Sequence, residues 1–355
     1  MKLPDRRPKL VIIGDRFLSP PVFEAAVRTA CGDVLDIETV ELPWPDEAMR
    51  HGYCEPGMEG LKEYQGDPDA IVRWVADAEI VVTQLAPFSA TMLERMPKLK
   101  LIVVARGGPV NIDLAAARRR EILVVNSPGR NASAVAEFTI GVILAEMRLI
   151  TRGHDALRKG RWRGDLYRAD LVGPELSEIA VGVIGYGHIG TKVVSLLKAF
   201  GCRALVADPY VQLSAADGRD GVRHVTLNTL LRESDVVTLH ARVTSETRGF
   251  IGRAEFAAMR KGATFVNTAR GPMVDYDALT EALKSGHLRG AALETFAAEP
   301  TPADLELLRL ENVTLTPHIA GASLKTIRHA ADAAAEEVRR YLSGEGPLNP
   351  CVPAP

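Results

Sequence analysis

Short apolar runs bounded by glycine, proline or aspartate recur along the chain, and longer segments with a helical repeat lie between them. The run Val181–Ile184 has no polar face, which is typical of a strand covered on both sides in a parallel sheet. Segments such as Ile189–Phe200 and Tyr276–Lys284 place apolar residues at the spacing of an amphipathic helix. Strands that alternate with helices in this way predict an α/β protein with parallel sheets. The predicted strands are Leu10–Ile13, Ile80–Thr83, Leu101–Val104, Leu123–Val125, Ile179–Ile184, Ala204–Ala207, Val236–His240, Thr264–Val266, Gly290–Leu293 and Val313–Leu315.

Two features divide this pattern into parts. The turn-rich stretch Asn126–Asn131 separates the early strands from an apolar helix predicted over Ala132–Met147. After Pro317 and His318 the strand pattern stops, and Ser323–Tyr341 is predicted to form one long alanine-rich helix. We therefore expect one domain boundary at the first turn and another after the last strand.

The composition is that of an ordinary globular protein. The 355 residues include 43 basic and 45 acidic ones, giving a formal net charge of −2, and 46% are hydrophobic. At about 150 residues per domain this length predicts two domains. The balanced charge argues against a protein that coats nucleic acid or an acidic membrane surface.

The four cysteines have neither CxxC spacing nor paired histidines, so we expect no metal site and no disulfide framework. Reduced thiols of this kind indicate a cytoplasmic protein. The cysteines are Cys31, Cys54, Cys202 and Cys351.

No segment reaches the roughly 18 apolar residues that a membrane helix needs. The best candidate, Ala134–Ala145, is interrupted by Glu137. The basic start Met1–Lys9 is followed only by the run Leu10–Ile13, which is too short for a secretory signal. We therefore expect no membrane association.

One segment is strongly basic. Between Arg148 and Arg168, seven basic residues stand against two acidic ones. Such a segment is either a patch for nucleic acid or another acidic partner, or a solvated helix and arm at a subunit interface. We favour the second interpretation, because the segment offers only Trp162 and Tyr167 for stacking on bases.

The strongest local motif is Gly-x-Gly-x-x-Gly, formed by Gly185, Gly187 and Gly190. It follows an apolar strand and opens a helix, which is the context of a dinucleotide-binding turn. In such a turn the first glycine permits the tight turn, the second lets backbone approach a pyrophosphate, and the third lets helix pack against strand. The pyrophosphate then lies at the N–H groups of the helix N-terminus.

An acidic residue supports this interpretation. Asp208 ends the next predicted strand, 18 residues after Gly190. A carboxylate there can accept hydrogen bonds from both adenine-ribose hydroxyls and repels a 2′-phosphate. The sequence therefore predicts NAD as the cofactor, in preference to NADP.

Arg270, Glu299 and His318 each come shortly after a predicted strand, where ligands bind in open α/β sheets. An arginine can bind a carboxylate through two parallel hydrogen bonds. A histidine beside a carboxylate is suited to general acid/base chemistry, because the carboxylate fixes the imidazole tautomer and stabilises the protonated ring.

With these motifs on one chain, the sequence resembles the D-2-hydroxyacid dehydrogenase family, which includes D-lactate, glyoxylate/hydroxypyruvate and 3-phosphoglycerate dehydrogenases. The resemblance covers nearly the whole chain. The intervals of 29 residues from Arg270 to Glu299 and of 19 from Glu299 to His318 are also similar to the family's. The matching motifs are Asn111–Leu114, Val135–Glu137, the glycine turn, Asp208–Pro209, His240 with Thr244 and Glu246–Thr247, Asn267–Gly271, Glu299–Pro300 and Thr316–Gly321.

The resemblance implies two Rossmann-like, doubly wound parallel-sheet domains. Residues 128–320 would form the dinucleotide-binding domain, and residues 1–127 plus 321–355 a smaller substrate domain made from both chain ends. The reaction would be hydride transfer between NAD(H) and C2 of a small anionic D-2-hydroxy or 2-oxo acid. The resemblance also implies a homodimer, with Ala132–Met147 and the following arm as its interface.

By the same resemblance, Arg270 would bind the substrate carboxylate and polarise the C2 carbonyl. His318 would be the proton donor and acceptor, and Glu299 would orient and charge it. The other substrate-binding residues would be Arg106, Gly107 and Gly108. The cofactor-binding residues would be Gly185, Tyr186, Gly187, His188, Ile189, Gly190, Asp208, His240, Thr268, Ala269, Arg270, Glu294, His318 and Gly321.

Several positions depart from the family's pattern. Glu294 stands where the family usually has an aspartate that touches the nicotinamide carboxamide, and its side chain is one methylene longer. Arg242 replaces a proline and adds a cation close to the cofactor, which weakens the preference for NAD. Arg106 replaces a small residue, and it either helps to hold an anionic substrate or points to solvent. The role of Arg130 stays open.

Two alternative functions share the scaffold. Formate dehydrogenases resemble this chain but have glutamine at the position of Glu299, so chemistry on a hydroxyl is favoured here. Dinucleotide-sensing co-repressors retain the same motifs, but this chain lacks long disordered flanks for partner motifs. An NAD-sensing regulatory protein is therefore the second hypothesis.

Overall fold

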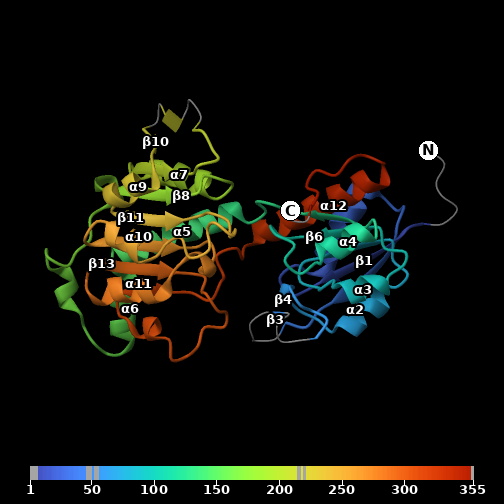
Figure 1. Ribbon diagram of the computed structural model, residues 1–355, viewed down its shortest axis with the longest axis horizontal. Coiled ribbons are helices and arrows are strands. Elements are labelled where there is room, and N and C mark those ends of the chain that lie inside the picture. The colour runs from blue at the N-terminus through green and yellow to red at the C-terminus, as the bar shows by residue number, and fades with distance from the viewer. Residues whose placement is uncertain (1–6, 45–49, 52–55, 214–216, 219–220, 353–355) are drawn as a thin grey trace. The chain divides into compact units, whose positions relative to one another are not determined.

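The protein is described by a computed structural model that covers residues 7–44, 50–51, 56–213, 217–218 and 221–352. The chain forms two compact units. Unit 1 comprises Met1–Asn131 and Ala322–Pro355, and unit 2 comprises Ala132–Gly321. Each unit has its own parallel sheet with helices beside it (Figure 1). Cys54 lies outside the described residues.

Unit 1 is built on a five-stranded parallel sheet in the order β2-β1-β5-β6-β7. Successive residues of a strand belong to two different apolar cores, with Val11 and Ile13 in one and Leu10 and Ile12 in the other. The sheet is therefore covered on both faces, which explains its continuous apolar runs. The strands are β1 (Lys9–Gly14), β2 (Asp36–Glu41), β5 (Ile80–Thr83), β6 (Leu101–Val104) and β7 (Leu123–Asn126), with a separate antiparallel pair of β3 (Arg50–His51) and β4 (Lys62–Tyr64). The helices are α1 (Pro20–Cys31), α2 (Pro68–Val75), α3 (Ala90–Glu94), α4 (Leu114–Arg119) and α12 (Leu324–Leu342).

Unit 2 contains a seven-stranded parallel sheet in the order β10-β9-β8-β11-β12-β13-β14. Its strands also alternate between two cores, since Val181 and Val183 lie in one core and Ile184 in the other. The strands are β8 (Ala180–Ile184), β9 (Arg203–Ala207), β10 (Arg223–His224), β11 (Val236–Leu239), β12 (Ala263–Asn267), β13 (Leu288–Leu293) and β14 (Val313–Leu315). The helices are α5 (Ala132–Met147), α6 (Ile150–Arg158), α7 (Gly190–Ala199), α9 (Leu227–Glu233), α10 (Arg253–Ala258) and α11 (Tyr276–Lys284), with short 3-10 turns at Gly164–Tyr167, Leu176–Glu178, Gly271–Met273 and Glu306–Arg309.

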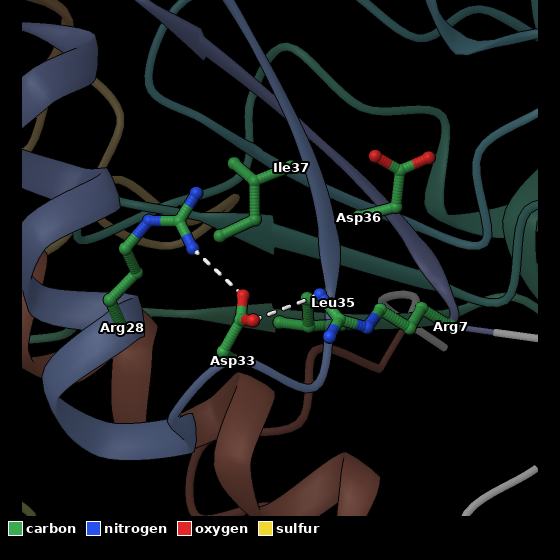
Figure 2. Close-up of a pocket in the computed structure, with 6 residues that line it drawn as sticks. All are labelled: Arg7, Arg28, Asp33, Leu35, Asp36 and Ile37. Carbon is green, nitrogen blue, oxygen red and sulfur yellow. Dashed lines mark hydrogen bonds and ion pairs between the residues drawn. The ribbon is translucent and has the colours of Figure 1, made fainter.

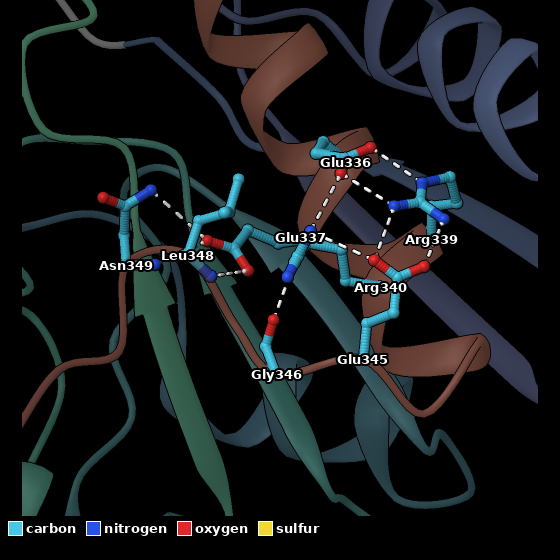
Figure 3. Close-up of polar contacts among 8 residues, drawn as sticks. All are labelled: Glu336, Glu337, Arg339, Arg340, Glu345, Gly346, Leu348 and Asn349. Atoms are coloured by element: carbon cyan, nitrogen blue, oxygen red, sulfur yellow. Dashed lines mark hydrogen bonds and ion pairs between the residues drawn. The ribbon is translucent and has the colours of Figure 1, made fainter.

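The last part of the chain returns to the sheet of unit 1. Helix α12 begins at an N-cap, Ser323, whose hydroxyl accepts the N–H of Thr326. Near its end, the buried Glu337 carboxylate accepts the backbone N–H groups of Leu348 and Asn349 (Figure 3). The following residues then pair with β7, where the Cys351 N–H donates to the Val124 carbonyl. This contact covers the outer edge of the parallel sheet.

The predicted fold class is confirmed, because both sheets are parallel and flanked by helices. The strands that the apolar pattern missed are β2, β3, β4 and β10. Strand β2 lies at the sheet edge, and its residues are exposed or half-buried without an apolar run. Strand β10 has only two residues, both exposed. Within the described residues, no helix combines the length and the apolar character needed to cross a bilayer.

Candidate active site

The three glycines of the β8–α7 turn meet different physical requirements. Gly185 has a φ of 93°, and a Cβ there would lie 2.8 Å from the backbone of His240 and Ala241. A Cβ on Gly190 would lie 2.1 Å from the Gly185 carbonyl oxygen, so the helix can approach the strand only without it. A Cβ on Gly187 would meet nothing within 4 Å. The turn therefore leaves open space at the middle glycine, beside the first N–H groups of α7.

Asp208 follows β9 directly and lies beside this turn. One carboxylate oxygen accepts the Tyr186 N–H at 2.8 Å, and the other accepts the Tyr210 N–H at 2.9 Å. Each oxygen keeps a second lone pair for a ligand hydroxyl. The oriented carboxylate, the open space at Gly187 and the N-terminus of α7 fit an adenosine diphosphate group.

The other sequence-predicted cofactor residues have varied environments. Tyr186 is buried, and burial raises the pKa of its hydroxyl to about 12. His188 is exposed and Ile189 half-buried. His240 is half-buried as a residue, but its ring Nδ1 is a buried atom without a hydrogen-bond partner among the described residues. Burial of the ring lowers the pKa of His240 to about 3, so the ring is neutral at physiological pH.

Arg270 stands on the loop that follows β12. The Asn267 side chain holds this loop, since its oxygen accepts the Ala269 N–H at 3.0 Å and its amide donates to the Arg270 carbonyl at 3.3 Å. Ala269 and Thr268 are buried, whereas Arg270 is exposed. The Arg270 guanidinium is therefore presented to solvent from a backbone that is fixed on the inner side.

Gly271 brings this loop against a second one. A Cβ on Gly271 would lie 2.0 Å from the Phe296 carbonyl, so only glycine permits this approach. Phe296 in turn donates its N–H to the Glu299 carboxylate at 2.9 Å. The loop of Arg270 and the loop of Glu299 are therefore in direct backbone contact.

Glu299 and His318 form a close pair. The His318 Nδ1 lies 2.8 Å from the second Glu299 oxygen, and the side chains are 26% and 27% exposed. The carboxylate accepts the Nδ1 proton, which leaves Nε2 as the ring atom for proton exchange with a ligand. Both groups are near enough to the surface for a ligand to reach them.

Glu294, which the family resemblance assigns to the cofactor site, lies buried beside the segment that carries His318. Its side chain is 2% exposed, and its carboxylate contacts the Thr316 hydroxyl and the Ala320 N–H. Both neighbours belong to the segment that carries His318, and Gly321 ends that segment as a half-buried residue. The carboxylate of Glu294 is thus directed at the His318 loop.

In unit 1, Arg106 does not point to solvent, which was one of the two expectations. It is 8% exposed, and its guanidinium contacts both the carbonyl and the carboxylate of Glu63. A Cβ on Gly107 or Gly108 would meet nothing within 4 Å, so the backbone beside Arg106 is accessible. Glu63 belongs to no motif, and sequence reasoning did not single it out.

Arg130 lies near this loop in the same unit. Its guanidinium is 6.0 Å from the centre of the Phe17 ring, and Nη1 is a buried atom without a hydrogen-bond partner among the described residues. Burial, together with the charge of Arg106, lowers the pKa of Arg130 to about 10. The charge of Asp15 raises the pKa of Arg130 and so offsets part of this lowering. Unit 1 therefore carries two arginines at the carboxyl ends of its strands.

A hollow of about 420 Å³ elsewhere in unit 1 is not a candidate active site. Beside this hollow, Asp33 pairs with Arg7 at 3.1 Å and with Arg28 at 3.4 Å. Figure 2 shows these three side chains. The hollow lies at the start of β2, which is the amino end of a parallel strand. Ligands of open α/β sheets bind at the carboxyl ends.

The basic arm after α5 is partly neutralised by acidic side chains beside it. Arg163 pairs with Asp165 and Arg168 with Asp170, each at 2.7 Å. Trp162 is 85% exposed and Tyr167 is 94% exposed. These pairs reduce the net charge that a nucleic acid would meet, and the exposed rings are apolar surface.

Comparisons with known proteins agree on one family. The family model described as D-isomer specific 2-hydroxyacid dehydrogenase, NAD binding domain, matches residues 140–320. The chain is 34% identical over 307 residues to the glyoxylate reductase of Thermofilum pendens, covering 86% of this chain and 91% of that protein. It is 39% identical over 279 residues to the D-3-phosphoglycerate dehydrogenase of Methanocaldococcus jannaschii, covering 78% of this chain and 52% of that protein, about half of its length. The solved structure of D-2-hydroxyisocaproate dehydrogenase matches with a TM-score of 0.81 at 25% identity, covering 97% of this chain and 100% of that chain.

Proposed function

Because the chain belongs to the D-2-hydroxyacid dehydrogenase family and uses NAD, we propose that it moves a hydride between NAD and C2 of a small anionic D-2-hydroxy or 2-oxo acid. The observation that carries this proposal is the 2.8 Å contact between His318 Nδ1 and the Glu299 carboxylate. Glutamate at this position also argues against formate as substrate, because a carboxylate can stabilise a protonated imidazole and an amide cannot.

Three side chains divide the chemistry in this proposal. Arg270 binds the substrate carboxylate in a forked contact and stabilises the negative charge that develops on the C2 oxygen. His318 Nε2 donates a proton to that oxygen in reduction and accepts the hydroxyl proton in oxidation. Glu299 holds the Nδ1–H, fixes the tautomer and stabilises the imidazolium. NAD, when bound, supplies or accepts the hydride.

The residues of the glycine turn would hold the cofactor. Open space at Gly187 would take the pyrophosphate at the N-terminus of α7, and Asp208 would accept the adenine-ribose hydroxyls. The preference for NAD over NADP rests on this carboxylate. Arg242 is exposed, and we assign it no direct contact.

We further propose that unit 2 is the dinucleotide-binding domain and unit 1 the substrate domain. Arg106, Gly107 and Gly108 would present a cation and accessible backbone to the acid, and Arg130 would add positive potential nearby. This arrangement favours an anionic substrate over a neutral one. The relatives named for glyoxylate and 3-phosphoglycerate suggest a short or a phosphorylated acid.

We also propose that the protein is a cytoplasmic homodimer. Large apolar side chains stand exposed along α6 and the arm, where a subunit interface would cover them. They are Ile150, Leu157, Trp162, Tyr167 and Val172, exposed by 58%, 59%, 85%, 94% and 46%.

The test is a panel of 2-oxo acids, including glyoxylate, hydroxypyruvate, a phosphorylated acid and a branched acid, each with NADH and NADPH. We expect oxidation of NADH with at least one acid, and a lower kcat/KM with NADPH. If NADH binds but no acid is reduced, the enzyme proposal fails. That result would favour the NAD-sensing regulatory protein.

A further inference from the structure

Glu294 connects the two loops that carry the proposed catalytic side chains. Its N–H donates to the Asn267 carbonyl at 3.0 Å, and Asn267 holds the loop of Arg270. Its own carbonyl accepts the His318 N–H at 3.0 Å. Through its backbone alone, Glu294 thus links β12 to the segment after β14.

The side chain adds two contacts to the same segment. One carboxylate oxygen accepts the Thr316 hydroxyl and the other accepts the Ala320 N–H. These donors lie on either side of His318 in sequence. Hydrogen bonds to an ionised carboxylate are stronger than neutral ones, so the two contacts fix the segment on both sides.

His318 needs such support, because its backbone has a φ of 54°. A residue with a Cβ pays about 1 kcal/mol or more in this left-handed region, and surrounding contacts must hold it there. The described contacts that hold it are the backbone bond to Glu294, the carboxylate of Glu294 and the Glu299 pair.

The electrostatics of Glu294 are dominated by its burial. Burial raises the pKa of the Glu294 carboxyl, and the charge of Glu299 adds to the rise. The Ala320 N–H, the Thr316 hydroxyl and the charge of His318 offset part of it, so the loop that Glu294 holds favours its charged form.

We propose that Glu294 is a positioning residue for proton transfer by His318 and does not act through a contact with the nicotinamide. Glu294 is 2% exposed, each of its carboxylate oxygens accepts a hydrogen bond from the His318 segment, and the longer glutamate side chain reaches Thr316 and Ala320. The proposal rests on the proposed function, because it takes His318 as the proton donor and acceptor.

The test uses Glu294→Gln with Glu146→Gln as a matched control. Glu146 is also buried in unit 2, and its carboxylate also accepts a threonine hydroxyl, that of Thr314 on β14. It pairs with Arg152 at 3.3 Å, whereas Glu294 contacts the His318 segment. An amide has one oxygen, so Glu294→Gln can keep at most one of its two acceptor contacts.

Four measurements separate the roles. Without ligand, hydrogen exchange of the amides in residues 316–321 should become at least about 10-fold faster in Glu294→Gln and stay unchanged in Glu146→Gln. With substrate, kcat should fall by roughly 10-fold to 100-fold and the solvent isotope effect should rise, because proton transfer becomes slower. The dissociation constant for NADH alone should stay within about 2-fold of wild type.

The proposal is overturned if NADH binding weakens about 10-fold while exchange of residues 316–321 is unchanged, since Glu294 would then be a cofactor ligand. It is also overturned if kcat stays near wild type. Should Glu294→Gln not fold, Thr316→Val removes one donor from the same contact, and Thr316→Ser should restore it. His318→Gln, measured beside them, tests the proposed function separately, because it must lose turnover whatever the role of Glu294.

Discussion

At the scale of single residues, the site depends on carboxylates whose orientation is fixed on both oxygens. Asp208, Glu294 and Glu299 each accept two hydrogen bonds from different donors. A carboxylate held in this way stays in one rotamer, so a group that it contacts is held as well. This precision allows Glu299 to fix a histidine tautomer.

His240 provides a prediction on pH. Its pKa is lowered to about 3 in the folded protein, whereas the unfolded chain binds the proton near its ordinary value of 6.5. The unfolded state therefore binds more protons between these values, and stability is lost as the pH falls below about 6.5. In the protein without cofactor, His240→Gln should remove this contribution. From pH 7 to pH 5 the free energy of unfolding should fall about 2 kcal/mol less in the variant than in wild type, as urea titrations would show.

If the difference in free energy of unfolding between wild type and His240→Gln does not change with pH, His240 takes up a proton in the native state. The lack of a hydrogen-bond partner for its buried Nδ1 among the described residues would then not reflect a neutral ring.

Sequence reasoning identified the chemical groups better than their surroundings. Arg270, Glu299 and His318 were found from motif and spacing, and the structure pairs the last two. The sequence alone could not place Glu63 beside Arg106, because that contact joins residues 43 positions apart without a shared motif. The direction of the Glu294 side chain likewise depends on the conformation of a distant loop.

At the scale of elements, the strand-turn-helix unit of β8 and α7 forms because Gly185 and Gly190 stand where a side chain would not fit. The turn needs a positive φ at Gly185, and the helix needs close contact at Gly190. Such backbone requirements are visible in the sequence as glycines at fixed spacing. Strand β2 could not be predicted from the sequence, because an exposed edge strand needs no apolar run and is fixed by pairing with β1.

Two glycine variants of this element should affect different properties, one the binding of NADH and the other the stability of the fold. Gly187→Ala adds a methyl group to open space, so the protein should keep its melting temperature within about 2 °C and bind NADH at least about 10-fold more weakly. Gly190→Ala forces a methyl group against the Gly185 carbonyl, so it should destabilise the fold by about 2–3 kcal/mol. Thermal unfolding and NADH fluorescence titration measure both effects. Unweakened NADH binding in Gly187→Ala would place the pyrophosphate elsewhere.

At the scale of the whole molecule, the two ends of the chain make one unit. Helix α12 packs on α1, and the residues after it pair with β7. The apolar pattern predicted the long helix, observed over Leu324–Leu342, but it could not indicate where this helix returns. That information came from the family resemblance, since contacts between distant parts of a chain leave little local signal.

Deletion of residues 345–355 should therefore destabilise unit 1 selectively. The deletion removes the partners of the buried Glu337 carboxylate and the backbone bonds to β7, which should cost about 2–4 kcal/mol. NADH binding, which we assign to unit 2, should be kept at low temperature. Glu345→Gln removes only exposed ion pairs with arginines of α12 and should cost less than about 1 kcal/mol. Equal effects of both changes on urea unfolding would contradict this role of the C-terminal segment.

Proton transfer by His318 is tested most directly by comparing turnover with cofactor binding in His318→Gln. A general acid/base contributes about 10²-fold to 10⁴-fold to the rate, so kcat for the reduction of a 2-oxo acid should fall by at least about 100-fold. The dissociation constant for NADH, measured by fluorescence without substrate, should stay within about 3-fold of wild type. Turnover within 10-fold of wild type, or equal losses in turnover and NADH binding, would show that His318 is not the proton donor and acceptor.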